Sequence, residues 1–127
     1  MEQAMMTTHD VANRYCELAK QNKWPQILDE LCSEDLMNKE PEHVSARGIE
    51  PVTKSLEAVK AKGIKNREMI EEIHSQRCSL PLVAGNFFTV TLSREVTFKG
   101  MPRMLKDEIG IFEVKNGKII VEQFFYG

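Results

Sequence analysis

Three side chains with acid–base chemistry stand out in the sequence: Glu40, Tyr15 and His74. Glu40 directly precedes Pro41. At the mouth of an apolar cavity its carboxylate would lose contact with water, which raises the pKa from about 4.3 and allows proton transfer near neutral pH. In an open polar stretch the same side chain would be a solvated surface charge. We therefore expect Glu40 to act as a general base if it faces a cavity.

Tyr15 lies on the apolar stripe of the first predicted helix. A buried phenol needs a hydrogen-bond partner, and one that faces a pocket is a natural donor to an oxyanion. The alternative is a core tyrosine whose hydroxyl bonds to backbone or water. Both interpretations stay open at the level of the sequence.

His74 follows two acidic residues in a segment that has strand character. If the strand phase holds, Glu72 and His74 share one face and could orient a base or bind a polar ligand group. The alternative is an exposed histidine on an acidic surface. A shift of one residue would replace the pair with Glu71, Ile73 and Ser75.

Glu40, Glu72, His74 and Glu108 are also the donor types of a His/carboxylate metal site. The sequence has no HxH or HExxH spacing, so we expect no metal. It also has no glycine-rich phosphate loop and no GxSxG motif, so we expect neither a nucleotide cofactor nor a covalent nucleophile.

The chain has 127 residues, enough for one domain over 1–127. Its formal net charge of −2 gives no electrostatic footprint for nucleic acid, and no apolar run is long enough to span a membrane. The three cysteines form no metal or disulfide pattern, and residues 1–6 have no signal-peptide character. We expect a cytoplasmic protein with reduced thiols.

The first half of the sequence predicts helices. Thr7 and Asp10 form a capping-box variant before the apolar stripe of the first helix. A short second helix restarts at Trp24-Pro25, and an extended piece follows over 36–42. A third helix is expected to open at Gly48 and Pro51, with Val52, Leu56 and Val59 on its apolar face, and to stop at Gly63.

The second half predicts long strands over 64–78, 82–98, 104–114 and 119–126, although a helix also suits the first of these. Asn116-Gly117 is typical of a tight hairpin turn. The whole pattern indicates an α+β domain, in which a curved antiparallel sheet carries three N-terminal helices on its concave face. A small-molecule cavity is expected between the first helix and the sheet.

Two local strings resemble the nuclear transport factor 2-like superfamily, which includes SnoaL-like polyketide cyclases and ketosteroid isomerases. The segment 107–120, DEIGIFEVKNGKII, is similar to the last hairpin of that superfamily, and 34–41, EDLMNKEP, is similar to its first strand. The resemblance covers nearly the whole chain. It implies a cone-shaped, cystatin-like sheet.

The opening of the chain resembles ketosteroid isomerases more closely. That resemblance implies that Tyr15 donates to an oxyanion and that Glu40 moves the proton. The second acid of those isomerases aligns with Gly110, and Glu108 lies two residues earlier on the same strand face. The sequence departs from the isomerases at this position.

Together these patterns predict a SnoaL-like protein that binds a small apolar or amphipathic molecule, with cofactor-free isomerisation or cyclisation next to a carbonyl as its reaction. A non-catalytic binding module and a protein-interaction domain are the alternatives. The candidate ligand contacts are Glu72, Glu108, Trp24 and Phe88, although the phenylalanines also suit a core. The last strand is apolar on both faces, which favours a sheet-to-sheet homodimer, and either Glu122 or Gln123 is expected to reach the cavity or the interface.

Overall fold

The computed structural model describes residues 5–127. The expectation of no signal peptide rests on residues 1–6 and so falls in part outside the described residues. The helical elements are α1 (Thr8–Lys20), α2 (Trp24–Leu31), the 3-10 helix η1 (Glu42–Arg47) and α3 (Leu56–Glu68). The strands are β1 (Cys32–Lys39), β2 (Val52–Lys54), β3 (Ile70–Cys78), β4 (Leu82–Ala84), β5 (Phe87–Phe98), β6 (Met104–Lys115) and β7 (Lys118–Phe125).

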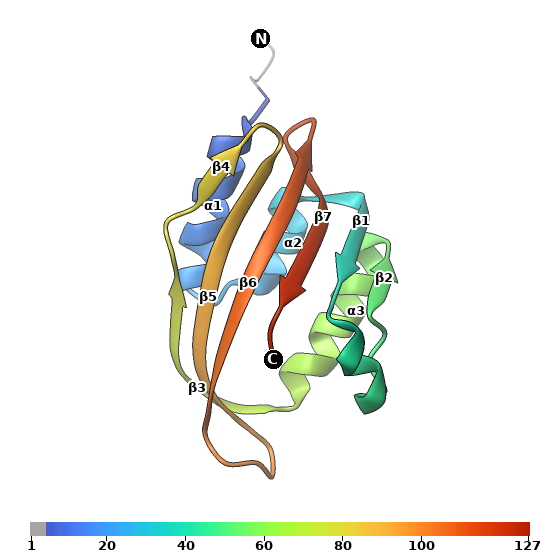
Figure 1. The fold of residues 1–127 in the computed structure, drawn as a ribbon, viewed down its shortest axis with the longest axis vertical. Helices are drawn as coiled ribbons and strands as arrows, with labels where there is room; N and C mark the ends of the chain where they lie inside the picture. Colours follow the sequence, from blue (N-terminus) through green and yellow to red (C-terminus); the bar gives the residue numbers. More distant parts are fainter. Residues whose placement is uncertain (1–4) are drawn as a thin grey trace.

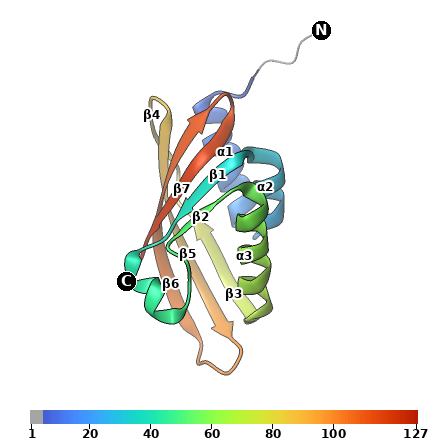
Figure 2. The ribbon, with the colours of Figure 1, turned by 90° about the vertical axis from the view of Figure 1, so that its right-hand side faces the viewer.

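Seven strands form one curved sheet in the order β2-β1-β7-β6-β5-β3, and β4 pairs with β5. Helices α1, α2 and α3 cover one face of this sheet (Figures 1 and 2). The α+β prediction and its curved sheet are confirmed. Strands β1 and β7 pair in parallel, whereas the sequence predicted an antiparallel sheet. Because β1 follows a helix and meets the last strand of the chain, no hairpin turn sets its direction.

The third helix differs from its predicted boundaries. Val52 lies in β2, and α3 begins after Ser55, whose side chain accepts a hydrogen bond from Ala58 N at 3.2 Å. The helix then passes through Gly63 to Glu68, so β3 begins only at Ile70. Gly63 does not stop the helix because Lys65, Arg67 and Glu68 are good helix formers.

Helix α1 anchors the apolar core. The predicted capping box is present, with Thr7 and Asp10 exchanging hydrogen bonds. Tyr15 is 1% exposed, and its ring lies 4.5 Å from that of Phe112, which stacks on Phe88 at 4.6 Å. Aromatic side chains therefore fill the space between α1 and the sheet at this level, where a ligand cavity had been expected.

The hairpin between β6 and β7 fixes the alternation of the last strand. Asn116 and Gly117 have φ values of 51° and 75°, the left-handed pair that suits a tight two-residue turn, as predicted. In the resulting register Glu122 lies opposite Phe112. Directly opposed residues share a face, so Glu122 points to the helix-covered side of the sheet and Gln123 to the other.

Candidate functional site

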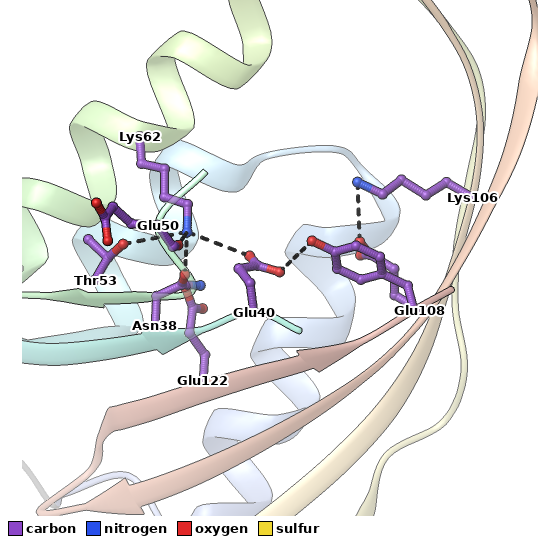
Figure 3. Close-up of polar contacts among 9 residues, drawn as sticks. Asn38, Glu40, Glu50, Thr53, Lys62, Lys106, Glu108 and Glu122 are labelled. Atoms are coloured by element: carbon purple, nitrogen blue, oxygen red, sulfur yellow. Dashed lines mark hydrogen bonds and ion pairs between the residues drawn. The ribbon is translucent and has the colours of Figure 1, made fainter. Parts of the chain in front are cut away.

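Beyond the aromatic core, the helix-covered face of the sheet becomes polar. Side chains from β1, β6, β7, α3 and the C-terminal segment meet there (Figure 3). We call this set the polar row, and it consists of Lys62, Asn38, Glu122, Glu40, Tyr126, Glu108 and Lys106.

Glu40 lies at the centre of the polar row. Its position is fixed directly after β1, where its backbone N–H donates to Pro51 O at 2.7 Å. The side chain is only 15% exposed, accepts a 2.8 Å hydrogen bond from the Tyr126 hydroxyl and lies 4.0 Å from Lys62 Nζ. Burial raises the pKa of Glu40, while Tyr126 and Lys62 oppose the rise. A carboxylate in this setting is suited to accept and return a proton.

Glu122 is the second carboxyl of the row. It is 6% exposed and accepts a 3.0 Å hydrogen bond from Asn38 Nδ2. Burial raises its pKa to about 7, and the charge of Glu40 adds to this rise, whereas Asn38 and Lys62 oppose it. The two carboxyls therefore influence each other's protonation.

Lys62 connects these groups from α3. Its ammonium donates to Asn38 Oδ1 at 2.8 Å and to Glu50 O at 3.2 Å (Figure 3). Burial lowers the pKa of Lys62, and the negative charges of Glu40 and Glu122 counteract the effect. Lys62 is thus a fixed positive charge beside both carboxyls.

The other end of the row comes from β6. Lys106 Nζ lies 3.4 Å from Glu108 Oε1 and 4.9 Å from the centre of the Tyr126 ring, a cation–π distance. Tyr126 therefore contacts Glu40 through its hydroxyl and Lys106 through its ring. Glu108 faces the same side of the sheet as Leu92, its register partner on β5. Glu40 and Glu108 therefore lie in the same cluster of side chains, around Tyr126 and Lys106.

Tyr15, Trp24 and Phe88 belong to the aromatic core. Within residues 5–127, the Tyr15 hydroxyl is buried with no hydrogen-bond partner, and burial raises its pKa well above the usual value. The Trp24 ring lies 6.2 Å from Tyr15 in an edge arrangement, and Phe88 is 1% exposed. The structure thus surrounds Tyr15 with rings instead of placing it beside Glu40.

His74 and Glu72 lie together elsewhere on the sheet. His74 Nδ1 is 2.6 Å from Glu72 Oε2, and its Nε2 is 2.8 Å from Thr97 Oγ1. Thr97 follows the fully buried Val96, so it points to the uncovered face. Glu72 is the register partner of Thr97, and His74 lies two residues further along β3, so strand alternation turns both side chains to that side. Among the described residues, then, His74 and Glu40 share no contact.

Four members of the polar row were not singled out from the sequence: Tyr126, Lys62, Asn38 and Lys106. Tyr126 lies just beyond β7, although residues 122, 124 and 126 alternate onto one face and could have indicated it. Lys62 lies on the helix segment that was expected to end at Gly63. Glu122 was considered only as one of two residues that could reach the cavity.

A surface groove of about 620 Å³ lies beside Glu40 and Gln123. Glu40 lines it together with residues of η1 and of the segment around Pro51. In the part of the chain that the structure describes, no group of three or more His, Cys, Asp or Glu side chains is arranged to hold a metal ion. Within the same residues no helix is both long enough and apolar enough to cross a membrane.

Several solved protein structures are similar to this one. A candidate SnoaL-like polyketide cyclase from Mesorhizobium loti is 30% identical, with a TM-score of 0.85 over 95% of this chain and 100% of that one. An NTF2-like protein of unknown function from Burkholderia pseudomallei is 16% identical, with a TM-score of 0.79 over 96% and 92%. No functionally curated protein is detectably similar in sequence.

A third neighbour carries a small molecule. It is a hypothetical protein from Catenulispora acidiphila with a ketosteroid isomerase-like fold, solved in complex with trimethylamine. It is 15% identical, with a TM-score of 0.73 over 95% of this chain and 88% of that one. The SnoaL-like domain model matches residues 6–126. The chain therefore belongs to the SnoaL-like family, on the fold that nuclear transport factor 2-like and ketosteroid isomerase-like proteins share.

Proposed function

We propose that this SnoaL-like protein is a cofactor-free acid–base enzyme that moves a proton at a carbon next to a carbonyl group. The observation that carries this proposal is the Glu40 carboxyl, which is 15% exposed, hydrogen-bonded to Tyr126 and 4.0 Å from Lys62. A desolvated carboxylate with a raised pKa matches the weak acidity of such a carbon better than a solvated one does.

The proton would travel as follows in an isomerisation. Glu40 takes the proton from the carbon, and the electron pair of the C–H bond moves to the carbonyl oxygen to give an enolate. Lys62, the cation 4.0 Å from Glu40, would stabilise the enolate oxygen. Where a carbon–carbon double bond adjoins the deprotonated carbon, the enolate extends over it as a dienolate. Glu40 then returns the proton to the far carbon of that double bond, the double bond moves into conjugation with the carbonyl group, and the product is an isomer of the substrate.

Cyclisation would use the same first step. The enolate carbon attacks a second carbonyl group of the same molecule, a carbon–carbon bond forms, and Glu40 returns its proton to the new alkoxide. The candidate cyclase from Mesorhizobium loti supports this variant of the proposal.

The ligand that suits this site is a small amphipathic molecule. Its polar atoms would contact the polar row, and its apolar part would lie against the aromatic core that begins at Phe124 and Phe112. The trimethylamine complex of the Catenulispora neighbour supports small-molecule binding on this fold.

The three cysteines are free and buried, which supports a reducing, cytoplasmic location.

The test is hydrogen exchange in D₂O at the carbons next to the carbonyl of 2-tetralone, followed by ¹H NMR. The proposal predicts that the protein accelerates exchange and that Glu40→Gln removes the acceleration. Exchange by the variant at the wild-type rate would overturn the proposal and favour a non-catalytic binding module.

We also propose that the chain forms a homodimer through the uncovered face of the sheet. On that face the exposed fractions are 49% for Phe87, 48% for Ile109 and 45% for Phe125, and Ile109 and Phe125 are register partners. Adjacent exposed apolar side chains on neighbouring strands are typical of an interface. This face is also where a protein-interaction domain would bind its partner.

A further inference from the structure

One level of the helix-covered sheet face carries a line of polar side chains that the proton transfer does not use. Gln76 on β3 is the register partner of Arg94 on β5, and Arg94 is the register partner of Lys106 on β6. Register partners point to the same face, so these three side chains lie side by side across three strands. On the neighbouring levels the β5 residues of this face are the buried Leu92 and Val96.

Arg94 is the unusual member of this line. It is partly buried, yet among residues 5–127 no hydrogen bond or ion pair joins its guanidinium to another side chain. Burial lowers its pKa, and only the more distant charge of Glu108 counteracts that effect. A desolvated charge without a partner destabilises a folded protein, so its presence calls for a compensating anion.

Gln76 is a second polar side chain of this line without a partner. Its Oε1 is buried and, in the described part of the chain, has no hydrogen-bond partner. Buried amides are normally satisfied, and the two ends of a glutamine amide exchange by a simple rotation. Turned over, the amide would offer N–H groups beside the Arg94 guanidinium.

The line adjoins the proposed catalytic carboxylate. Lys106 lies over the Tyr126 ring, and the Tyr126 hydroxyl bonds to Glu40. A guanidinium is a planar fork that binds a carboxylate through two parallel hydrogen bonds. A molecule anchored at Arg94 and Lys106 would extend across Tyr126 towards Glu40.

We infer that Arg94, assisted by Lys106 and Gln76, binds a carboxylate group of the ligand, so that the substrate class is a keto acid or an aromatic acid with a nearby carbonyl. This inference extends the proposed function, because it names the ligand class for the same site. The acid group binds at Arg94, and the reacting carbon lies at Glu40.

The test compares two matched probes by isothermal titration calorimetry, 2-naphthoate and its neutral amide 2-naphthamide. The wild-type protein is expected to bind the carboxylate more tightly than the amide. Arg94→Met keeps the apolar stem but removes the charge, and it should weaken carboxylate binding by roughly tenfold or more while leaving the amide unaffected. Arg77→Gln, on the exposed side of β3, is the matched control and should change neither affinity.

The outcomes separate this inference from the proposed function. Glu40→Gln should keep carboxylate binding while losing hydrogen exchange. If the wild-type protein binds the carboxylate selectively but does not accelerate hydrogen exchange, the carboxylate subsite at Arg94 is supported and the proposed catalysis is overturned. Equal affinity for the two probes, no detectable carboxylate binding, or unchanged carboxylate binding in Arg94→Met would overturn the subsite. Thermal unfolding checks the fold of Arg94→Met, whose Tm should match or exceed that of the wild type, because an unpaired desolvated charge has been removed.

Discussion

The hydroxyl of Tyr126, the penultimate residue, donates a 2.8 Å hydrogen bond to Glu40 Oε2 across 86 residues of sequence. This contact joins the end of β1 to the end of β7, which are neighbours through the parallel pair of the sheet. It favours the charged form of Glu40 against the effect of burial. The C-terminal segment is therefore part of the site.

Replacing the Tyr126 hydroxyl should shift the pH dependence of catalysis. Tyr126→Phe removes the hydrogen bond that lowers the pKa of Glu40, so the rise of activity with pH should move to higher pH. The profile of 2-tetralone exchange against pH measures this shift. Tyr15→Phe is the matched control, because the Tyr15 hydroxyl has no partner among the described residues, and its profile should stay in place. A shift in Tyr15→Phe instead would return the donor role to helix α1.

Glu122 should make stability depend on pH. The folded protein holds its proton up to about pH 7, whereas the unfolded chain releases it near 4.5. The free energy of unfolding should therefore fall as pH rises through this window, by about 3 kcal/mol from this group. Glu122→Gln should flatten the slope and be more stable than the wild type above pH 7, although Glu40 leaves a slope of the same sign. Urea unfolding between pH 4 and 8 measures the free energy of unfolding of both proteins as a function of pH.

The control for the pH dependence of stability is a carboxyl that is exposed in the folded protein. Glu17→Gln changes an exposed carboxyl on α1 and should leave the slope unaltered. If Glu122→Gln keeps the full wild-type slope, Glu122 does not hold a proton in the folded protein at neutral pH.

Gly110 is required by the packing of the aromatic core. A Cβ at this position would lie 2.8 Å from two ring atoms of Phe112 and 3.3 Å from Phe124. Gly110→Ala should therefore destabilise the protein by about 1–3 kcal/mol in chemical unfolding. Gly63→Ala in α3 meets nothing within 4 Å and should stabilise the helix by up to about 1 kcal/mol. Equal effects of the two substitutions would refute this account of Gly110.

The uncovered face of the sheet should control the oligomeric state. Ile109→Glu places a charge at the centre of the proposed interface, where it would be desolvated, so the dimer should dissociate. Sedimentation velocity measures the mass. Leu80→Glu alters a side chain that is 83% exposed in the loop between β3 and β4 and should leave the dimer intact. A wild-type protein that is monomeric at high concentration would contradict the proposal.

Local patterns in the sequence predicted most of the fold. The apolar stripe of α1, the alternation of β5 and the Asn116-Gly117 turn each depend on neighbouring residues only, and each has its expected form. The boundary between α3 and β3 was misplaced because residues 64–69 suit both a helix and a strand. Only packing against the sheet decides between them.

The candidate site was harder to predict because it depends on contacts between distant residues. Glu40 was a candidate because the resemblance to ketosteroid isomerases implies a carboxylate directly before a proline as the base. The alternation of β3 puts Glu72 and His74 on one face, but the sequence does not show which face of the sheet the helices cover. The filling of the expected cavity by Tyr15, Phe88 and Phe112 is likewise a property of three elements together.

The most direct test of the central claim is the rate of 2-tetralone hydrogen exchange in the wild type, in Glu40→Gln and in Glu42→Gln, measured by ¹H NMR in D₂O. Glu42 is an exposed carboxyl two residues away and serves as the control. The account predicts accelerated exchange in the wild type and in Glu42→Gln, and only the background rate in Glu40→Gln. Equal rates for all three proteins would contradict it, because Glu40 would then move no proton.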